Sequence, residues 1–201
     1  MNSGTPFLSA HASAADWQIA AKEIVQQLDG VAAAHRLGFL YVTDHFSVYL
    51  DEISIFLRQT LGVPHWVGTV GFGVCATAQE YFDAPAIVVM VAPIPKESFR
   101  IFKDVSDDIK CITETHKEWL SSPIPPLTVV HGDPRNPRVG DLISEISDAT
   151  EGFLVGGLTA AEENFVQIAD NVTDGGLSGV LFSLDKVPVQ AGLTQGCSPI
   201  G

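Results

Sequence analysis

Apolar side chains in this chain follow two spacings, one typical of helices and the other typical of strands. Apolar residues three or four positions apart predict amphipathic helices, the first of which begins at a capping-box-like segment from Ser13 to Asp16. Asp44 and Ser47 are suited to cap a second helix, which Gly62 ends. The helices expected from this spacing cover residues 15–35, 44–61, 99–120 and 142–149.

Short runs rich in Val, Ile, Leu and Phe lie between these helices and predict strands. The run 86–92 is apolar at every position, as is typical of a strand that is covered on both faces. The expected strands cover residues 39–43, 66–74, 86–92, 127–131, 151–159 and 175–183.

The order of these elements predicts the fold class. Helices and strands alternate first, and strands dominate later, which indicates an α/β layered domain with a mixed β-sheet. Its glycine-rich strands are expected to be covered by the amphipathic helices. No long linker divides the sequence, so residues 1–201 are expected to form a single domain. The segment 195–201 follows an apolar strand without a polar tail, which favours either a partner subunit that completes the sheet or a longer, two-domain protein.

Glycines interrupt three of the expected strands, at residues 67–74, 151–159 and 175–183. Glycine weakens a strand, so its presence there suggests a bulge, a bend, or a close approach of the backbone to another backbone or to a ligand. We therefore expect a ligand-binding cleft at the ends of these strands. Its candidate residues are Gly71, Gly73, Cys75, His131, Asp133, Gly156, Gly157 and Thr159.

The composition narrows the range of partners. Hydrophobic residues make up 46% of the 201 residues and charged residues 17%, which favours a folded globular chain. The formal net charge of −13 disfavours nucleic acid and anionic membrane surfaces as partners. The start of the chain lacks the pattern of a secretory signal, and no apolar run approaches the length of a membrane span. Three widely spaced cysteines fit a reducing compartment, so a cytoplasmic location is expected.

Cys75 is the cysteine best placed for chemistry, because neighbouring glycines could expose its thiol. A nucleophilic thiol needs a base within hydrogen-bond reach, and a small buried cysteine is the commoner case. Residues 71–76 match the dinucleotide-binding pattern G-x-G-x-x-A, but the stretch before the next strand has no room for the helix that this site requires. The nucleophile-elbow pattern G-x-S-x-G is not met at Ser178, because Gly179 follows the serine directly and Val180 takes the last place, so Ser178 is expected to be an ordinary strand residue.

His131 lies at the end of an expected strand, where α/β sheets often bind ligands. A single histidine in an apolar cleft can hold haem, although a loop histidine bonded to the backbone is the commoner case. The histidines and cysteines show no spacing typical of a structural zinc site. No cofactor is therefore assigned from the residues.

Several short phrases occur in a recognisable order at residues 40–43, 66–73, 85–92, 155–159, 179–183 and 195–201. Together they resemble the FIST N-terminal domain, a module of F-box and intracellular signal-transduction proteins. The resemblance runs from about Gly38 to the last residue. It implies a sensory domain and not a catalyst, with a small-molecule ligand such as an amino acid, or haem as in some bacterial members. It also implies a C-terminal companion domain, while Ser198 stands where the family often has a basic residue.

Three hypotheses about function remain open at this stage. The first is a sensory module that binds a small metabolite at the glycine-rich strand ends. The second is an adaptor that pairs with a partner, such as a companion domain or a second copy, through an exposed C-terminal strand. The third is an enzyme that uses the thiol of Cys75.

Overall fold

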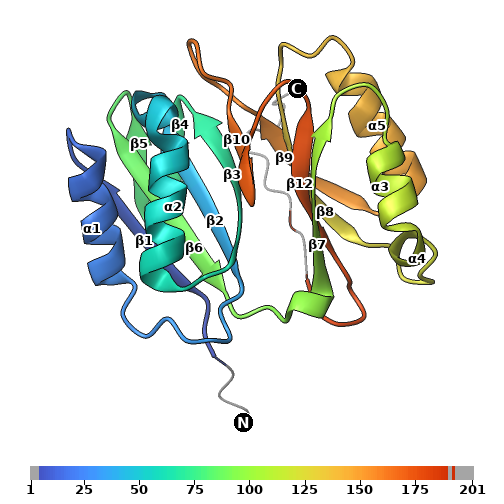
Figure 1. Ribbon diagram of the computed structural model, residues 1–201, viewed down its shortest axis with the longest axis horizontal. Coiled ribbons are helices and arrows are strands. Elements are labelled where there is room, and N and C mark those ends of the chain that lie inside the picture. Colours follow the sequence, from blue (N-terminus) through green and yellow to red (C-terminus); the bar gives the residue numbers. More distant parts are fainter. Residues whose placement is uncertain (1–4, 190–191, 193–201) are drawn as a thin grey trace, which may run out of the picture.

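Two β-sheets pack face to face in the middle of the molecule, and helices cover their outer faces (Figure 1). The computed structural model describes residues 5–189 and 192. The fold class is α/β with mixed sheets, as the sequence predicts. Among the described residues, no helix is both long and apolar enough to cross a membrane.

The larger sheet has six strands in the order β1-β6-β2-β3-β10-β11. Strands β2 and β3 run parallel, and the other neighbours are antiparallel. Helices α1 and α2 cover its outer face, where Ile24, Ile53 and Leu57 are fully buried. The strands are β1 (Leu8–Ser13), β2 (Leu37–Thr43), β3 (His65–Gly71), β6 (Ala86–Ala92), β10 (Gln167–Ala169) and β11 (Asn171–Thr173), and the helices are α1 (Trp17–Gln27) and α2 (Leu50–Leu61).

The smaller sheet has four strands in the order β7-β12-β8-β9, with β8 and β9 parallel. Its outer face packs on α5 and on the α3–α4 segment through a separate core that includes Leu142 and Ile146. The strands are β7 (Phe99–Val105), β8 (Leu127–Gly132), β9 (Phe153–Leu158) and β12 (Leu177–Phe182), and the helices are α3 (Lys110–Thr115), α4 (Lys117–Leu120) and α5 (Val139–Thr150). A third core, which includes Phe39, Val67 and Val180, fills the space between the two sheets.

Three smaller elements complete the fold. The hairpin of β4 (Gly73–Ala76) and β5 (Gln79–Phe82) follows β3 directly. One 3-10 helix, η1 (Asp44–Tyr49), precedes α2, and another, η2 (Lys96–Ser98), precedes β7. The hairpin occupies the stretch in which a dinucleotide site would need a helix; the sequence predicts the absence of that helix but not the hairpin.

The helix expected over residues 99–120 is wrong in its first part, because residues 99–105 form strand β7. Phe102 and Val105 are three positions apart, which resembles helical spacing, yet both pack on the α5 side of the sheet. The pairing of β7 with β12 shifts register between Leu177 and Gly179, and Asp104 has a φ of 59°. This bulge places Phe102 and Val105 on one face of a strand, so the period of two is lost.

Other sequence expectations differ from the structure at their boundaries. Helix α1 starts at its N-cap Asp16, whose Oδ1 accepts a hydrogen bond from the backbone N–H of Gln18 at 2.6 Å, but it ends at Gln27. Gly30, with a φ of 89°, lies in the turn that follows. The sequence does not predict strand β1, because its buried positions, which face the helices, are the small residues Ala10 and Ala12, and these give a weak apolar signal.

The expectation of an exposed C-terminal strand does not fit β12, because it pairs with β7 on one side and β8 on the other. All six of its residues are buried. The segment 195–201, which prompted that expectation, lies outside the described residues. Strand β9 is an edge strand of the smaller sheet, and its side chains Phe153 and Leu158 are exposed.

Candidate functional site

A cavity of about 830 Å³ lies between the two sheets. The six-stranded sheet contributes β1, β2 and β6, and the four-stranded sheet contributes β8, β9 and the end of β12. The β4–β5 hairpin and the segment after β12 add further walls. The lining residues include His11, Tyr41, Cys75, Met90, Val129 and Val155.

Strand alternation explains how these side chains reach the cavity. In β2, Leu40 and Val42 point to the helical core, so Phe39 and Tyr41 point to the opposite sheet. In β6, Val89 and Val91 likewise face the helices, which directs Met90 inward. The inward side chains of β6, β8 and β9 at Met90, Val129 and Val155 are only half-buried. The inner faces are therefore apolar but incompletely covered by each other.

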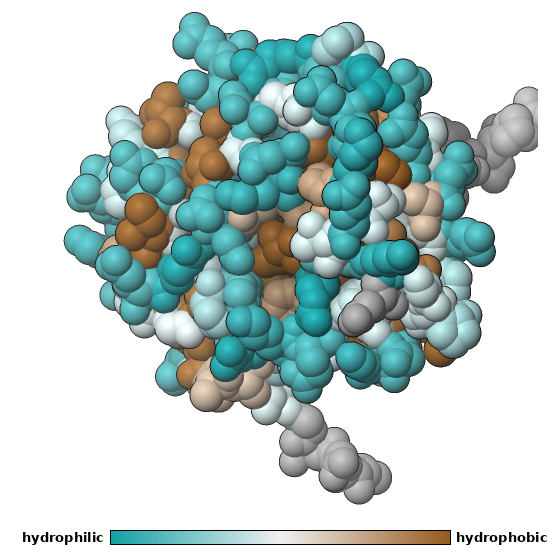
Figure 2. Space-filling view, turned by 45° about the vertical axis from the view of Figure 1, so that its right-hand side comes forward, coloured by the Kyte–Doolittle hydropathy of each residue, from teal (hydrophilic) through white to brown (hydrophobic). Residues whose placement is uncertain are grey.

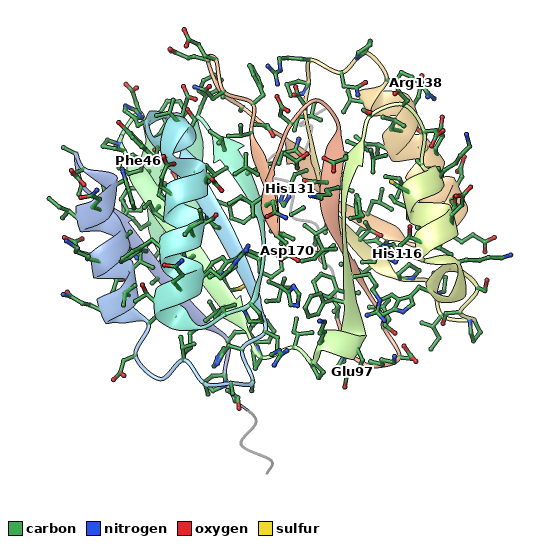
Figure 3. All side chains as sticks on the ribbon, in the orientation of Figure 1. Phe46, Glu97, His116, His131, Arg138 and Asp170 are labelled. Carbon is green, nitrogen blue, oxygen red and sulfur yellow. The ribbon has the colours of Figure 1, made fainter. Side chains whose placement is uncertain are left out.

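Tyr41 brings a polar group to the cavity wall and connects it to a buried histidine. The Oη of Tyr41 lies 3.0 Å from Nε2 of His131, which is on β8 of the opposite sheet. The two rings meet edge to face, with centroids 5.6 Å apart. His131 is 2% exposed, and its Nδ1 has no hydrogen-bond partner among the described residues. Figure 3 shows His131 between the two sheets.

Burial determines the charge of both groups. It lowers the pKa of His131 to about 4 and raises the pKa of Tyr41 to about 12, because the charged form of each loses its hydration. Both side chains are therefore neutral near pH 7. As a phenol, Tyr41 keeps one donor and two acceptor positions, so its hydroxyl can bond to His131 and to a second group.

Two further polar contacts join the sheets. Ser178 on β12 donates a hydrogen bond from Oγ to Oε1 of Gln167 on β10 at 2.6 Å. Thr69 on β3 and Thr159, just after β9, place their hydroxyl oxygens 2.6 Å apart. Ser178 is thus a buried strand residue, as expected from the sequence. Together with the Tyr41–His131 contact, these pairs link the two sheets through side chains.

Strand β1 and the β4–β5 hairpin carry further polar groups at the cavity. Nδ1 of His11 on β1 lies 2.6 Å from Oη of Tyr81 on β5, which attaches the hairpin to the edge of the larger sheet. Cys75 on β4 is exposed and lines the cavity. The sequence favoured a buried structural cysteine at this position, but the short hairpin leaves one of its faces open to solvent.

Of the eight candidate residues, Cys75 lines the cavity, and His131, Thr159 and Gly157 do not line it but take part in contacts between strands or sheets. His131 contacts the lining residue Tyr41, and Thr159 belongs to the contacts between the sheets. Gly157 pairs with His131 in the β8–β9 register, and a methyl group added at Gly157 would meet no atom within 4 Å.

The other four candidates have local structural roles in the described structure. A side chain at Gly156 would collide with the carbonyl oxygen of Val130, so this glycine allows β8 and β9 to approach each other. A side chain at Gly71 would press on the carbonyl oxygen of Gly73, which is compatible with the tight turn from β3 into β4. A Cβ at Gly73 would lie 3.0 Å from the ring of Phe82 and 3.1 Å from the carbonyl oxygen of Tyr81, within the β4–β5 hairpin. None of these three glycines lines the cavity.

Asp133 is fully buried and holds a turn together. It accepts hydrogen bonds from Nη2 of Arg135 at 2.6 Å and from the backbone N–H of Gly175 at 2.8 Å. Burial alone would raise the pKa of Asp133, but these hydrogen bonds outweigh it and hold the pKa below its usual value. Its carboxylate is therefore engaged within the turn and does not line the cavity.

Sequence reasoning missed Tyr41 and His11 as site residues. The position of Tyr41 on the inner face follows from alternation in β2, which the sequence predicts, whereas His11 lies on β1, which the sequence does not predict. Their proximity to the second sheet depends on which sheets face each other, and no local pattern contains that information.

His131 is not placed as the haem ligand that the sequence suggests, because it does not line the cavity and its Nε2 bonds to Tyr41. Within residues 5–189 and 192, no three His, Cys, Asp or Glu side chains form a group suited to a metal ion.

Comparison with known proteins places this architecture in a family. A search of curated proteins found no match. The family model described as FIST N domain matches residues 36–201, which include β2 and all the later elements. The chain therefore belongs to the FIST N domain family, a family of sensory signal-transduction domains.

Proposed function

We propose that this chain is the small-molecule-binding part of an intracellular sensor and that the cavity between the two sheets is its ligand site. The observation that supports this most directly is the 830 Å³ cavity itself. Its volume is within the range of about 300–1,000 Å³ that is typical of small-molecule sites. Its lining combines apolar side chains with a few polar groups, as such sites usually do.

The contacts between the sheets suggest how binding is transmitted. Tyr41 lines the cavity and also bonds to His131 on the opposite sheet. With Tyr41 as the donor to Nε2 of His131, a ligand that accepts the same hydroxyl proton would compete with His131 and would change the contact between the sheets at the same time. Binding therefore favours one relative arrangement of the sheets over another, in proportion to its differential affinity for the two arrangements.

A ligand screen by thermal denaturation tests this proposal. A ligand at about 100 times its Kd stabilises the folded chain by about 2.7 kcal/mol, which raises the Tm by roughly 5–10 °C at this size. We expect such a shift with one chemical class among amino acids, carboxylates, nucleotides, haem and uncharged apolar compounds. The shift should disappear in Val155→Trp, which fills the cavity from β9. A shift of equal size in Val155→Trp would contradict the proposed site.

A second candidate is a role as an adaptor, and strand β9 favours it. Its outer edge pairs with no strand among the described residues, and Phe153 and Leu158 beside that edge are 58% and 49% exposed. An open edge of this kind can accept a strand from a companion domain or from a second copy of the chain. Light scattering on the purified chain tests pairing between copies. A concentration-dependent dimer supports such pairing, and a monomer at every concentration rules it out.

A further inference from the structure

We infer that the cavity selects an uncharged, largely apolar molecule that carries one hydrogen-bonding group for Tyr41, in preference to a free amino acid or another charged metabolite. This inference rests on the proposed function, because it names the class of ligand for the same site. Three observations support it: the chemistry of the lining, the sequence of the remaining residues, and the state of the polar groups at Tyr41.

The described lining contains no Asp, Glu, Lys or Arg side chain. Its polar members are Ser9, His11, Tyr41, Cys75 and Thr77, and the other lining residues are apolar or glycine. The segments outside the description, 1–4, 190–191 and 193–201, contain none of these four charged residue types in their sequence. They therefore cannot supply a charged side chain of these types to the cavity, wherever they lie.

This absence of charge separates the possible ligands. An ionised group that leaves water for an apolar cavity loses several kcal/mol or more unless a partner of opposite charge meets it. A free amino acid has two such groups, and the described lining offers neither a carboxylate nor a basic side chain of the Lys or Arg type. An anion is disfavoured further by the net charge of −13. An uncharged molecule avoids these costs.

The polar groups at Tyr41 suit an uncharged hydrogen-bonding group. Tyr41 lines the cavity and bonds to His131, and both are neutral near pH 7 for the reason given above. Nδ1 of His131 is buried without a hydrogen-bond partner among the described residues, and Gly157 beside it leaves open space. Because His131 itself does not line the cavity, a neutral group of the ligand meets the hydroxyl of Tyr41, which has hydrogen-bonding capacity for a second partner.

Two fluorescent probes with nearly the same aromatic skeleton test the inference. N-phenyl-1-naphthylamine is uncharged, and 1-anilinonaphthalene-8-sulfonate carries a sulfonate on the same framework. We expect saturable binding of the uncharged probe to the full chain and at least tenfold weaker binding of the sulfonate. Val155→Trp should abolish binding of the uncharged probe. Phe153→Trp is the matched control, because it changes an exposed residue of the same strand that does not line the cavity.

The outcomes distinguish this inference from the proposed function. If the sulfonate binds as tightly as the uncharged probe and Val155→Trp removes both, the cavity is the site but the inferred ligand class is wrong. If neither probe binds, or if the folded Val155→Trp variant binds the uncharged probe as tightly as the unchanged chain does, the proposed site itself is wrong. Met90→Trp fills the cavity from the larger sheet and replaces Val155→Trp if circular dichroism shows that Val155→Trp does not fold.

Discussion

His131 illustrates, at the scale of single residues, how a polar side chain remains neutral inside this fold. It is 2% exposed, and among the described residues its Nε2 bonds to Tyr41 while its Nδ1 has no partner. Desolvation therefore dominates, and the histidine has a pKa of about 4 in the folded chain. This links the stability of the domain to pH.

His131→Gln should weaken the dependence of stability on pH. Between about pH 6.5 and pH 4, the unfolded chain binds a proton at His131 that the folded chain does not, so stability falls as the pH falls. The loss is about 3 kcal/mol over this range at 1.36 kcal/mol per pKa unit. Urea unfolding at about pH 7 and pH 4.5 measures it. The exposed His45→Gln serves as the control, and an unchanged slope in His131→Gln would contradict this account.

Two residues that the sequence singles out have a clear place in the structure. Cys75 was singled out because neighbouring glycines could expose its thiol, and it is exposed and lines the cavity; His131 was singled out at a strand end, and it contacts the lining residue Tyr41. Asp133 was selected for the same reason, but its turn encloses the carboxylate together with Arg135. Whether a side chain at a strand end turns toward the sheet interface or into its own loop depends on partners that are remote in sequence.

Strands β8 and β9 show, at the scale of elements, that neighbouring glycines can serve different purposes. Gly156 has a φ of 150°, and a side chain there would strike the backbone of β8. Gly157, the next residue, has open space where its side chain would be. The first glycine permits strand pairing, whereas the second leaves room beside His131.

Gly156→Ala and Gly157→Ala should therefore differ greatly in stability. The added methyl group at Gly156 forces β9 away from β8 and should destabilise the domain by roughly 2–4 kcal/mol. The methyl group at Gly157 has space and should change stability by less than about 0.5 kcal/mol. Chemical denaturation of the two variants side by side gives the comparison. Similar losses of stability in both variants would show that the close approach of β8 and β9 at Gly156 does not require glycine.

Most elements could be predicted from local patterns, and the failures have identifiable causes. The strand at 86–92 and the helix at 142–149 were anticipated because their apolar spacing is regular and each has clear boundaries. The helix predicted over residues 99–105 was wrong because the bulge in β7 gives the apolar residues of a strand the spacing of a helix. The three-residue strand β10 carries too few positions to show any period.

At the scale of the whole molecule, the sequence predicts layers but not their number. It indicates a mixed sheet covered by helices, whereas the chain forms two main sheets with helices on both outer faces (Figure 1). Strands buried on both faces look alike whether their second face meets a helix or another sheet. The cavity is a product of that sheet-to-sheet arrangement, so it could not be predicted from local patterns.

The surface also reflects the composition of the chain. The face shown in Figure 2 is mostly hydrophilic, with apolar side chains in small separate groups. Such a surface suits a chain with a net charge of −13 and no need for a large apolar contact on this side.

The unequal width of the two sheets has a consequence for the lifetime of the protein. Six strands face four, and the cavity leaves part of the inner surface of the wider sheet uncovered by the narrower one. Under the proposed function, an apolar ligand in the cavity would act as a removable part of the hydrophobic core, so the unfolded fraction would rise when the ligand becomes scarce. Cellular proteases act on unfolded chains, and a change of 1–2 kcal/mol alters abundance several-fold. The amount of the protein would then follow the supply of its ligand, which gives the domain a record of past exposure in addition to its immediate response.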